Sequence, residues 1–194
     1  MQLNTKQDLT EETPQQVVEI TKEDLTAQQE GEDKTLVGKA YHKLLERCDF
    51  DADDDGLKAT MELIVNEGWF GQEIAQKVDL LKIKNLLNNK EFKKLCDGGK
   101  IYREMPFLSE LPYNQLFGEG ATREIMLQGV IDLLVVKQDH AIVVDFKVTT
   151  NSYKVKERYA KQLNSYKMAV NKCLKLPVKT YVVSILDNKI IEFW

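Results

Sequence analysis

Apolar residues in the first part of the chain recur every three or four positions, which is the spacing of an amphipathic helix. This spacing predicts a helix over residues 35–48. Its apolar positions are Val37, Tyr41, Leu44, Leu45 and Cys48. A second helix is expected from Leu57 to Glu67 and should end at Gly68, because glycine commonly closes helices. Residues 71–89, "GQEIAQKVDLLKIKNLLNN", predict one or two further helices.

The second half of the chain has the continuous or alternating apolar runs of strands. We predict strands over residues 101–108, 124–136 and 140–148, then a long amphipathic helix over residues 153–173. The inward positions of this helix are Val155, Tyr159, Leu163, Tyr166, Ala169, Val170 and Cys173. Two last strands, "KTYVVSIL" and "KIIEFW", flank a turn at Asp187-Asn188. This order predicts an α/β (α+β) fold with a helical N-terminal part and a mixed central β-sheet flanked by helices.

Composition and length indicate one large domain with an appendage. The chain has 194 residues, of which 43% are hydrophobic and 30% charged, as in ordinary globular proteins. Residues 1–34 contain nine acidic side chains against three lysines. We expect this stretch to be an acidic, weakly ordered leader or the truncated end of something larger, and residues 35–194 to form the domain. No apolar run approaches about 18 residues, and no signal peptide precedes the domain, so a soluble intracellular protein without membrane contact is expected.

The basic side chains gather in one region. Residues 147–179 contain nine lysines and arginines against one glutamate, a net charge of +8. This asymmetry indicates either a surface that faces a polyanion or a lysine-rich solvent face. The three cysteines, Cys48, Cys96 and Cys173, are odd in number and far apart, so we interpret them as small core or boundary residues and expect neither an iron–sulfur cluster nor a zinc ribbon.

Two carboxylates and a lysine interrupt the apolar hairpin "GVIDLLVVKQDHAIVVDFKV", residues 129–148. If residues 137–140 form the loop, the symmetric register places Asp132 opposite Asp145. Lys147 lies two residues beyond Asp145 and shares its face. Two close carboxylates repel each other unless a cation joins them. The hairpin therefore predicts either a site for Mg²⁺ or Mn²⁺ beside a lysine, or a salt-bridge cluster without metal.

Several motifs around this hairpin resemble one family. "GVID…VVDFKVTT" resembles the core motif of PD-(D/E)xK nucleases, "VGKAYHKLLE" the helix that carries the family histidine, "YREMPF" the arginine–glutamate strand, and "QLNSY" the QxxxY motif. In this order, over roughly residues 35–194, they resemble the C-terminal nuclease domain of AddA/RecB-type helicase–nucleases, the AddA type above all. The resemblance implies a restriction-endonuclease-like core and metal-dependent exonuclease activity on DNA in double-strand-break repair and recombination.

The resemblance also implies roles for individual residues. It assigns the divalent metal, Mg²⁺ with Mn²⁺ as an alternative, to His42, Asp132, Asp145 and the backbone carbonyl of Phe146. Lys147 corresponds to the catalytic lysine. Gln162 and Tyr166, one helical turn apart, match QxxxY, which supports the site and the phosphate backbone. Glu104 matches an acidic position near the site. Without the family context, each of these side chains has a structural reading: His42 as a surface or core histidine, Gln162 and Tyr166 as a helix-boundary pair, and Glu104 with Arg103 as an exposed strand pair.

The chain also departs from the longer members of the family. It has no Walker GxxxxGK, and it lacks the four cysteines that hold an iron–sulfur cluster in AddB-like relatives. We therefore expect a nuclease domain from a longer bacterial cytoplasmic protein, with a helicase motor in the same full-length chain, an AddB-like second subunit, and single-stranded DNA at the active site. A stand-alone RecB-like exonuclease, or a catalytically silent module that binds DNA or a partner, remains an alternative.

One competing motif lies between the first two helices. "DADDDGLKATME", Asp51 to Glu62, matches the spacing of an EF-hand calcium loop. However, Lys58 stands where such loops place an apolar residue, and no second loop is present to pair with it. An acidic loop with Asp55 as the N-cap of the next helix explains the same letters. We do not expect calcium binding there.

Overall fold

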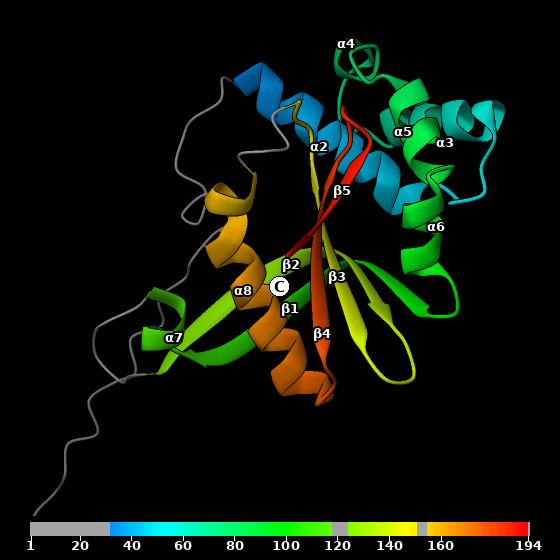
Figure 1. Ribbon diagram of the computed structural model, residues 1–194. Coiled ribbons are helices and arrows are strands. Elements are labelled where there is room, and N and C mark those ends of the chain that lie inside the picture. Colours follow the sequence, from blue (N-terminus) through cyan, green and yellow to red (C-terminus); the bar gives the residue numbers. More distant parts are fainter. Residues whose placement is uncertain (1–31, 118–123, 151–154, 194) are drawn as a thin grey trace, which may run out of the picture.

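The computed structural model describes residues 32–117, 124–150 and 155–193 (Figure 1). Most of the predicted acidic leader, residues 1–31, lies outside the described residues. The first described helix, α2 (Glu32–Arg47), begins three residues before the predicted domain boundary. Among the described helices, none combines the length and the apolar character needed to cross a membrane.

Five strands form one mixed sheet in the order β1-β2-β3-β4-β5. They are β1 (Lys100–Pro112), β2 (Glu124–Val136), β3 (Ala141–Lys147), β4 (Val178–Ser184) and β5 (Lys189–Phe193). All neighbours are antiparallel except β3 and β4, which are parallel. Parallel neighbours need a crossover, and helix α8 (Val155–Leu174) supplies it. The predicted mixed sheet with flanking helices is confirmed.

The helical part comprises α2 and four further helices before the sheet. They are α3 (Asp54–Asn66), α4 (Gln72–Ala75), α5 (Leu80–Leu87) and α6 (Lys90–Cys96). A short α7 (Tyr113–Phe117) follows β1. Side chains of Asp53, Asp79 and Asn89 accept backbone N–H bonds at the first turns of α3, α5 and α6, which places the helix starts. The prediction of Asp55 as the N-cap of α3 is wrong, because Asp53 accepts the N–H of Gly56 and the helix starts earlier.

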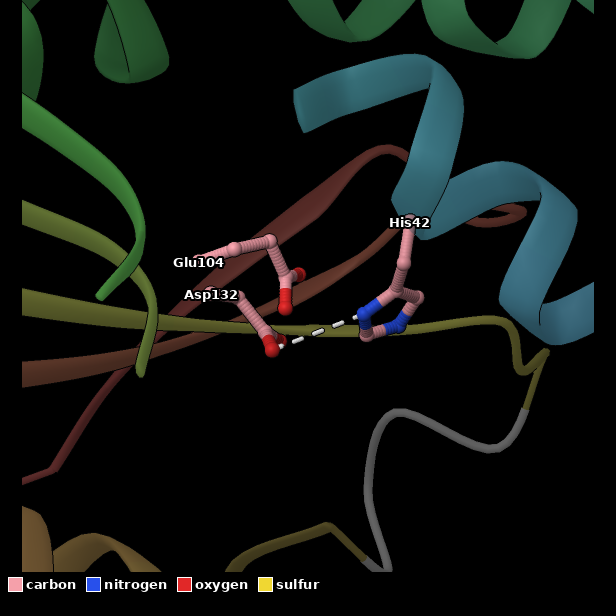
Figure 2. Close-up of side chains that lie close together, drawn as sticks. All are labelled: His42, Glu104 and Asp132. Carbon is pink, nitrogen blue, oxygen red and sulfur yellow. Dashed lines mark ion pairs between the residues drawn. The ribbon is translucent and has the colours of Figure 1, made fainter. Parts of the chain in front are cut away.

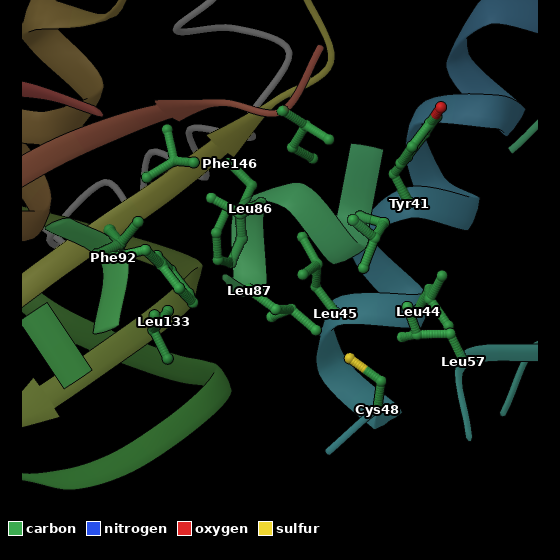
Figure 3. Close-up of a cluster of buried hydrophobic side chains, with 14 of the residues drawn as sticks. Tyr41, Leu44, Leu45, Cys48, Leu57, Leu86, Leu87, Phe92, Leu133 and Phe146 are labelled. Carbon is green, nitrogen blue, oxygen red and sulfur yellow. The ribbon is translucent and has the colours of Figure 1, made fainter. Parts of the chain in front are cut away.

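The two faces of the sheet carry separate cores. Helices α2 to α6 lie on one side of the sheet and α8 lies on the other (Figure 1). On the first side, Leu133, Val144 and Phe146 of the sheet pack with residues of α2, α3, α5 and α6 in the largest apolar cluster (Figure 3). On the second side, Leu134 and Val143 pack against Tyr166 and Val170 of α8. The hairpin β2–β3 is therefore covered on both faces, which explains its almost continuous apolar run.

The inward stripe of α8 ends earlier than predicted. Tyr159, Leu163 and Tyr166 are buried as expected, but Cys173 is exposed. The last turn of the helix borders an apolar groove along β1 instead of lying over the sheet, so Cys173 lines the groove with Met105 and Leu108. The side chain of Val155 lies outside the described residues. The other two cysteines are partly or fully buried, and burial raises the pKa of the Cys48 and Cys96 thiols to about 11.

Candidate active site

His42 reaches the sheet from helix α2. Its Nδ1 lies 3.5 Å from Oδ1 of Asp132 in β2 (Figure 2). The imidazole meets the ring of Phe146 edge-on, with the centroids 6.3 Å apart and the planes at 88°. The Asp132 side chain is completely buried, whereas that of His42 is 22% exposed. The site is thus buried on the side of the sheet and reachable on the side of the helix.

Asp132 stands where strand β2 changes the face that it presents to each core. Alternate residues of a regular strand face the same side of a sheet. Leu133 nevertheless packs beneath helices α2 to α6, while Ile131, two residues earlier, packs against α8. Strand β1 changes in the same way, since Ile101 packs on the helical side and Phe107 on the side of α8. Both strands therefore reverse their faces at the same level of the sheet.

The reversal is centred on Glu104. Arg103 pairs with Leu133 and Met105 pairs with Ile131, but the register is interrupted between these pairs, where Glu104 would oppose Asp132. Glu104 has a φ of 46°, in the left-handed region that a residue with a side chain rarely adopts. Such a conformation costs on the order of 1–3 kcal/mol and clusters at functional sites. The distortion places a carboxylate oxygen of Glu104 close to Asp132 and His42: one ligand atom from each of the three lies within 4.8 Å of the others.

The hairpin has the predicted register. Its loop is residues 137–140, and Val136 pairs with Ala141 and Leu134 with Val143, as the symmetric register requires. The backbone pairing ends at Leu133 and Val144, one position before Asp132. There the N–H of Phe146 donates to Oδ2 of Asp132 at 2.8 Å. A side-chain carboxylate thus receives a bond from the opposite strand just beyond the last backbone pair, which fixes its orientation.

Asp145 and Lys147 form a close pair on β3. The Asp145 side chain is fully buried, and its Oδ2 lies 2.7 Å from Nζ of Lys147. The ammonium also donates to Oε1 of Gln162 at 3.4 Å and lies 4.4 Å above the ring of Tyr159. These contacts fix the lysine between the sheet and α8, where its side chain stays 15% exposed.

The predicted pair Gln162 and Tyr166 continues this line of contacts into α8. Nε2 of Gln162 donates to the hydroxyl oxygen of Tyr166 at 2.8 Å, and both residues are buried. The ring of Tyr166 packs edge-on against Phe107, with the centroids 5.4 Å apart. The structure therefore brings both residues next to Lys147. Tyr166 also fits the inward stripe of α8, so the packing role and the site role coincide.

The donor set fits a divalent cation. Two carboxylates this close disfavour their shared ionised state unless positive charge lies between them, and carboxylate oxygens are the ligands that Mg²⁺ and Mn²⁺ prefer. The grouping differs from the one implied by the sequence. His42 and Asp132 lie together as expected, Glu104 completes the group, and Asp145 is not a member of it. Asp145 contacts Lys147 instead, so its role and that of the Phe146 carbonyl as metal ligands stay predictions.

The alternative calcium loop does not have the required shape. Helix α3 begins at Asp54, so most of the segment from Asp51 to Glu62 is helical. Asp55 and Glu62 are seven residues apart on this helix, which separates their backbones by roughly 10 Å. A calcium loop needs these side chains to converge on one ion. The acidic residues serve the start of the helix instead, and Asp54 also contacts Lys84.

The comparisons with known proteins agree with this fold and site. The family model of the PD-(D/E)XK nuclease superfamily matches residues 15–189. A crystal structure of a protein from Eubacterium rectale, provisionally described as an exonuclease, superposes with a TM-score of 0.51 at 15% identity and covers 86% of this chain and 61% of that one. That likeness supports a nuclease-type fold with a mixed sheet. The chain belongs to the PD-(D/E)XK nuclease superfamily, a divalent-metal-dependent family.

More specific relatives come from curated bacterial sequences. An ATP-dependent helicase/nuclease polypeptide of the AddA type from Carboxydothermus hydrogenoformans is 34% identical over 157 residues, which is 76% of this chain. A protein of the same name from Ruminiclostridium cellulolyticum is 28% identical over 165 residues, or 80% of the chain. The chain spans only 13% of the length of each. It is thus homologous to the nuclease part of such helicase/nuclease polypeptides.

Proposed function

We propose that this chain hydrolyses DNA phosphodiesters as a Mg²⁺-dependent exonuclease domain, with Mn²⁺ as a substitute. The observation that carries the proposal is the meeting of His42, Glu104 and Asp132 within 4.8 Å, one strand away from the Asp145–Lys147 pair. A group of acceptors that can hold a cation therefore lies beside a group of donors that can hold a phosphate. The family membership makes phosphodiester hydrolysis the reaction of choice.

The acceptors would hold the metal. We assign His42, Asp132, Asp145 and the Phe146 carbonyl as its ligands, and Glu104 lies close enough to join them. When bound, the ion would acidify an attacking water and offset charge on the phosphate. Asp132 contributes a preset geometry, because the Phe146 N–H holds one of its oxygens and leaves the other directed at His42.

Lys147 would hold the reacting groups on the other side. Its ammonium can orient the attacking water and stabilise negative charge that develops on the phosphate oxygens. Asp145 and Gln162 each receive one of its contacts, so the cation has a fixed position. Tyr166 in turn fixes Gln162, which makes the pair a support for the lysine and for the phosphate backbone.

The substrate would be a single DNA strand that passes along α8. Lys161 and Lys172 are exposed on this helix, and their charges suit phosphate groups. The names of the relatives support a place in a longer chain with a helicase motor, next to an AddB-like second subunit, in the cytoplasmic repair and recombination of double-strand breaks. A stand-alone exonuclease and a silent binding module are the alternatives.

The test is cleavage of an end-labelled single strand with Mg²⁺, with and without a chelator, by the chain and by two variants. Asp145→Ala and Lys147→Ala should abolish cleavage while circular dichroism shows an intact fold. Asp139→Ala and Lys137→Ala, in the hairpin loop, are the matched controls and should cleave normally. Undiminished cleavage by both site variants would refute the assignment. No cleavage by the unaltered chain, together with tight DNA binding, would favour the silent module.

A further inference from the structure

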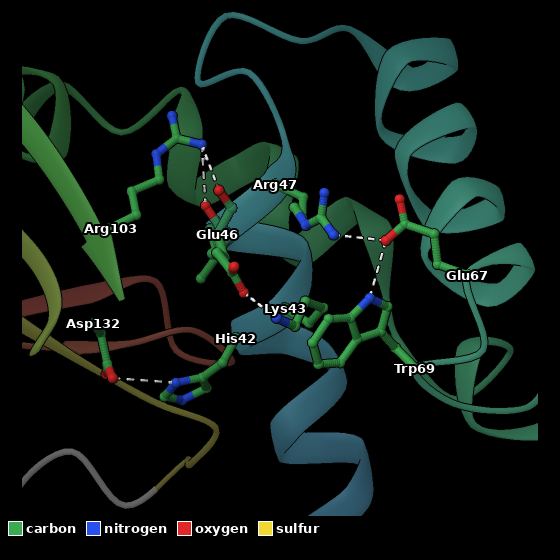
Figure 4. Close-up of polar contacts among 9 residues, drawn as sticks. His42, Lys43, Glu46, Arg47, Glu67, Trp69, Arg103 and Asp132 are labelled. Atoms are coloured by element: carbon green, nitrogen blue, oxygen red, sulfur yellow. Dashed lines mark hydrogen bonds and ion pairs between the residues drawn. The ribbon is translucent and has the colours of Figure 1, made fainter. Parts of the chain in front are cut away.

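We infer that Arg103 is a positioning residue that sets the metal-binding geometry, an inference that rests on the proposed function. Arg103 precedes Glu104 in β1, and its side chain extends to the end of helix α2 (Figure 4). Nη1 donates to the carbonyl oxygens of Leu45 at 3.4 Å, Glu46 at 3.0 Å and Cys48 at 2.5 Å. One guanidinium therefore joins the strand of Glu104 to the helix of His42.

These carbonyls need a partner. The last four C=O groups of a helix find no N–H donor within it, and a glycine cap or water commonly satisfies them. Helix α2 ends at Arg47 without a following glycine, and the next residues are Cys48 and Asp49. Arg103 supplies the missing donors, and its charge also suits the negative end of the helix dipole.

An aromatic ring holds the guanidinium in place. Cζ of Arg103 lies 3.9 Å from the centroid of Phe50, a distance at which cation and ring attract each other. Phe50 packs edge-on against Phe92 at 5.4 Å, and Phe92 packs against Phe146 at 6.1 Å. Phe146 then meets the His42 imidazole. The contacts run from Arg103 through three rings to His42, and the backbone of α2 closes the circuit.

This circuit includes all three members of the candidate metal group. Glu104 is bonded to Arg103 in the chain, His42 lies on the clamped helix, and Asp132 accepts the N–H of Phe146. Apolar contacts between α2 and its neighbours are non-directional, so they resist separation better than rotation or sliding. Three hydrogen bonds from one planar group fix both. Arg103 therefore determines where the His42 imidazole stands relative to Glu104 and Asp132.

The exposed arginine of the same helix end provides a matched comparison. Arg47 forms its ion pair with Glu67 of the C-cap of α3, 2.6 Å away and on the far side of α2 from Asp132 (Figure 4). It carries the same charge at the same helix terminus, but its ion pair leads away from the three metal-group residues. Removing it should leave the metal geometry unchanged.

The experiment is calorimetric titration of the folded chain with Mn²⁺, without DNA. Loss of an outer-shell partner of a metal site commonly costs about 10–100-fold in affinity. We expect Arg103→Met to weaken Mn²⁺ binding by about tenfold or more, and Arg47→Met to leave it within about twofold. Arg103→Lys should fall between the two, because an ammonium keeps the charge but lacks the planar fork. Ile64→Val, in the core away from the clamp, controls for a general loss of stability and should keep wild-type affinity.

If Arg103→Met does not fold, Phe50→Leu gives the same test, because it removes only the ring that orients the guanidinium; it should weaken Mn²⁺ binding by a smaller factor. Equal Mn²⁺ affinity in the wild type, Arg103→Met and Phe50→Leu would overturn the inference and leave the proposed function intact. A loss in Ile64→Val as large as in Arg103→Met would also overturn it. Absence of Mn²⁺ binding by the wild-type chain would instead refute the metal site, and the inference with it.

Discussion

The two faces of the hairpin β2–β3 present different chemistry. Toward α2, the site offers acceptors: the His42 nitrogen and the carboxylates of Glu104 and Asp132. Toward α8, it offers a cation and its supports, namely Lys147 with Gln162 and Tyr166. Asp145 is the carboxylate that directly contacts the lysine.

The difference teaches how a single sheet can hold opposite charges near each other without neutralising them. The acceptor side is distorted, with Glu104 at a φ of 46° and with both β1 and β2 reversing their faces. The lysine side is regular, because β3 pairs with β4 along its whole length. If this division is functional, variants on the acceptor side should affect metal binding and cleavage together, and variants on the lysine side should affect cleavage alone.

The largest effect is expected from Asp132→Asn. This change keeps the size of the side chain but removes the negative charge that faces His42. We expect Mn²⁺ binding to disappear from calorimetry and single-strand cleavage to fall by about 10³-fold, since metal and orientation are lost together. Asp139→Asn, an exposed carboxylate in the hairpin loop, should change neither. Normal metal binding by Asp132→Asn would place the cation elsewhere.

Lys147→Met should separate the two sides. The cation is lost while the apolar stem remains, so cleavage is expected to fall by about 10²–10³-fold. Mn²⁺ affinity should stay within about threefold of the wild-type value, since the acceptor group is untouched. Lys137→Met, in the hairpin loop, serves as the control. Should the metal affinity fall as steeply as cleavage, the division between acceptor and lysine sides would be wrong.

A smaller effect is expected from Tyr166→Phe. The ring and its packing against Phe107 remain, but Gln162 loses the hydroxyl that it contacts at 2.8 Å. A hydrogen bond of this kind contributes about 0.5–1.5 kcal/mol, which corresponds to roughly a 2–12-fold decrease in the cleavage rate. Single-turnover kinetics would measure it, with Tyr102→Phe on β1 as the comparison. A loss in thermal stability without any change in rate would leave Tyr166 a packing residue only.

The smallest effect concerns the lysines of α8. Lys161→Gln and Lys172→Gln should each weaken single-strand binding modestly and lower the slope of log affinity against log salt by about 0.7, the value for one phosphate contact. Fluorescence anisotropy at several salt concentrations would measure this slope. An unchanged slope would show that the strand follows another surface.

The sequence predicted most of the fold because its patterns are local. The 3.6-residue spacing located α2 and α3, and the apolar runs located β2, including both of its ends. The length of the hairpin loop fixed the pairing of Val136 with Ala141. The order of the motifs also predicted the nuclease superfamily, which the family comparison confirms.

The sequence did not predict features that depend on distant contacts. The left-handed conformation of Glu104 arises between two strands and has no signal in "YREMPF". The bond network of Arg103 joins residues 55 to 58 positions apart, so a local pattern could not show it. Cys173 follows the inward stripe of its helix but is exposed, because the helical period does not tell where the sheet beneath it ends. The glutamate beside a half-buried arginine in a strand was the one signal available for this part of the site.

The position of Mn²⁺ in a crystal of the chain tests the central claim most directly. Anomalous scattering at the manganese edge should give a peak at coordination distance, about 2–2.3 Å, from Asp132 and from the His42 imidazole, with Lys147 in the outer shell. The same map would show whether Asp145 or Glu104 supplies the next carboxylate. A fully occupied peak at the acidic segment from Asp51 to Asp55, with none beside Asp132, would contradict the account.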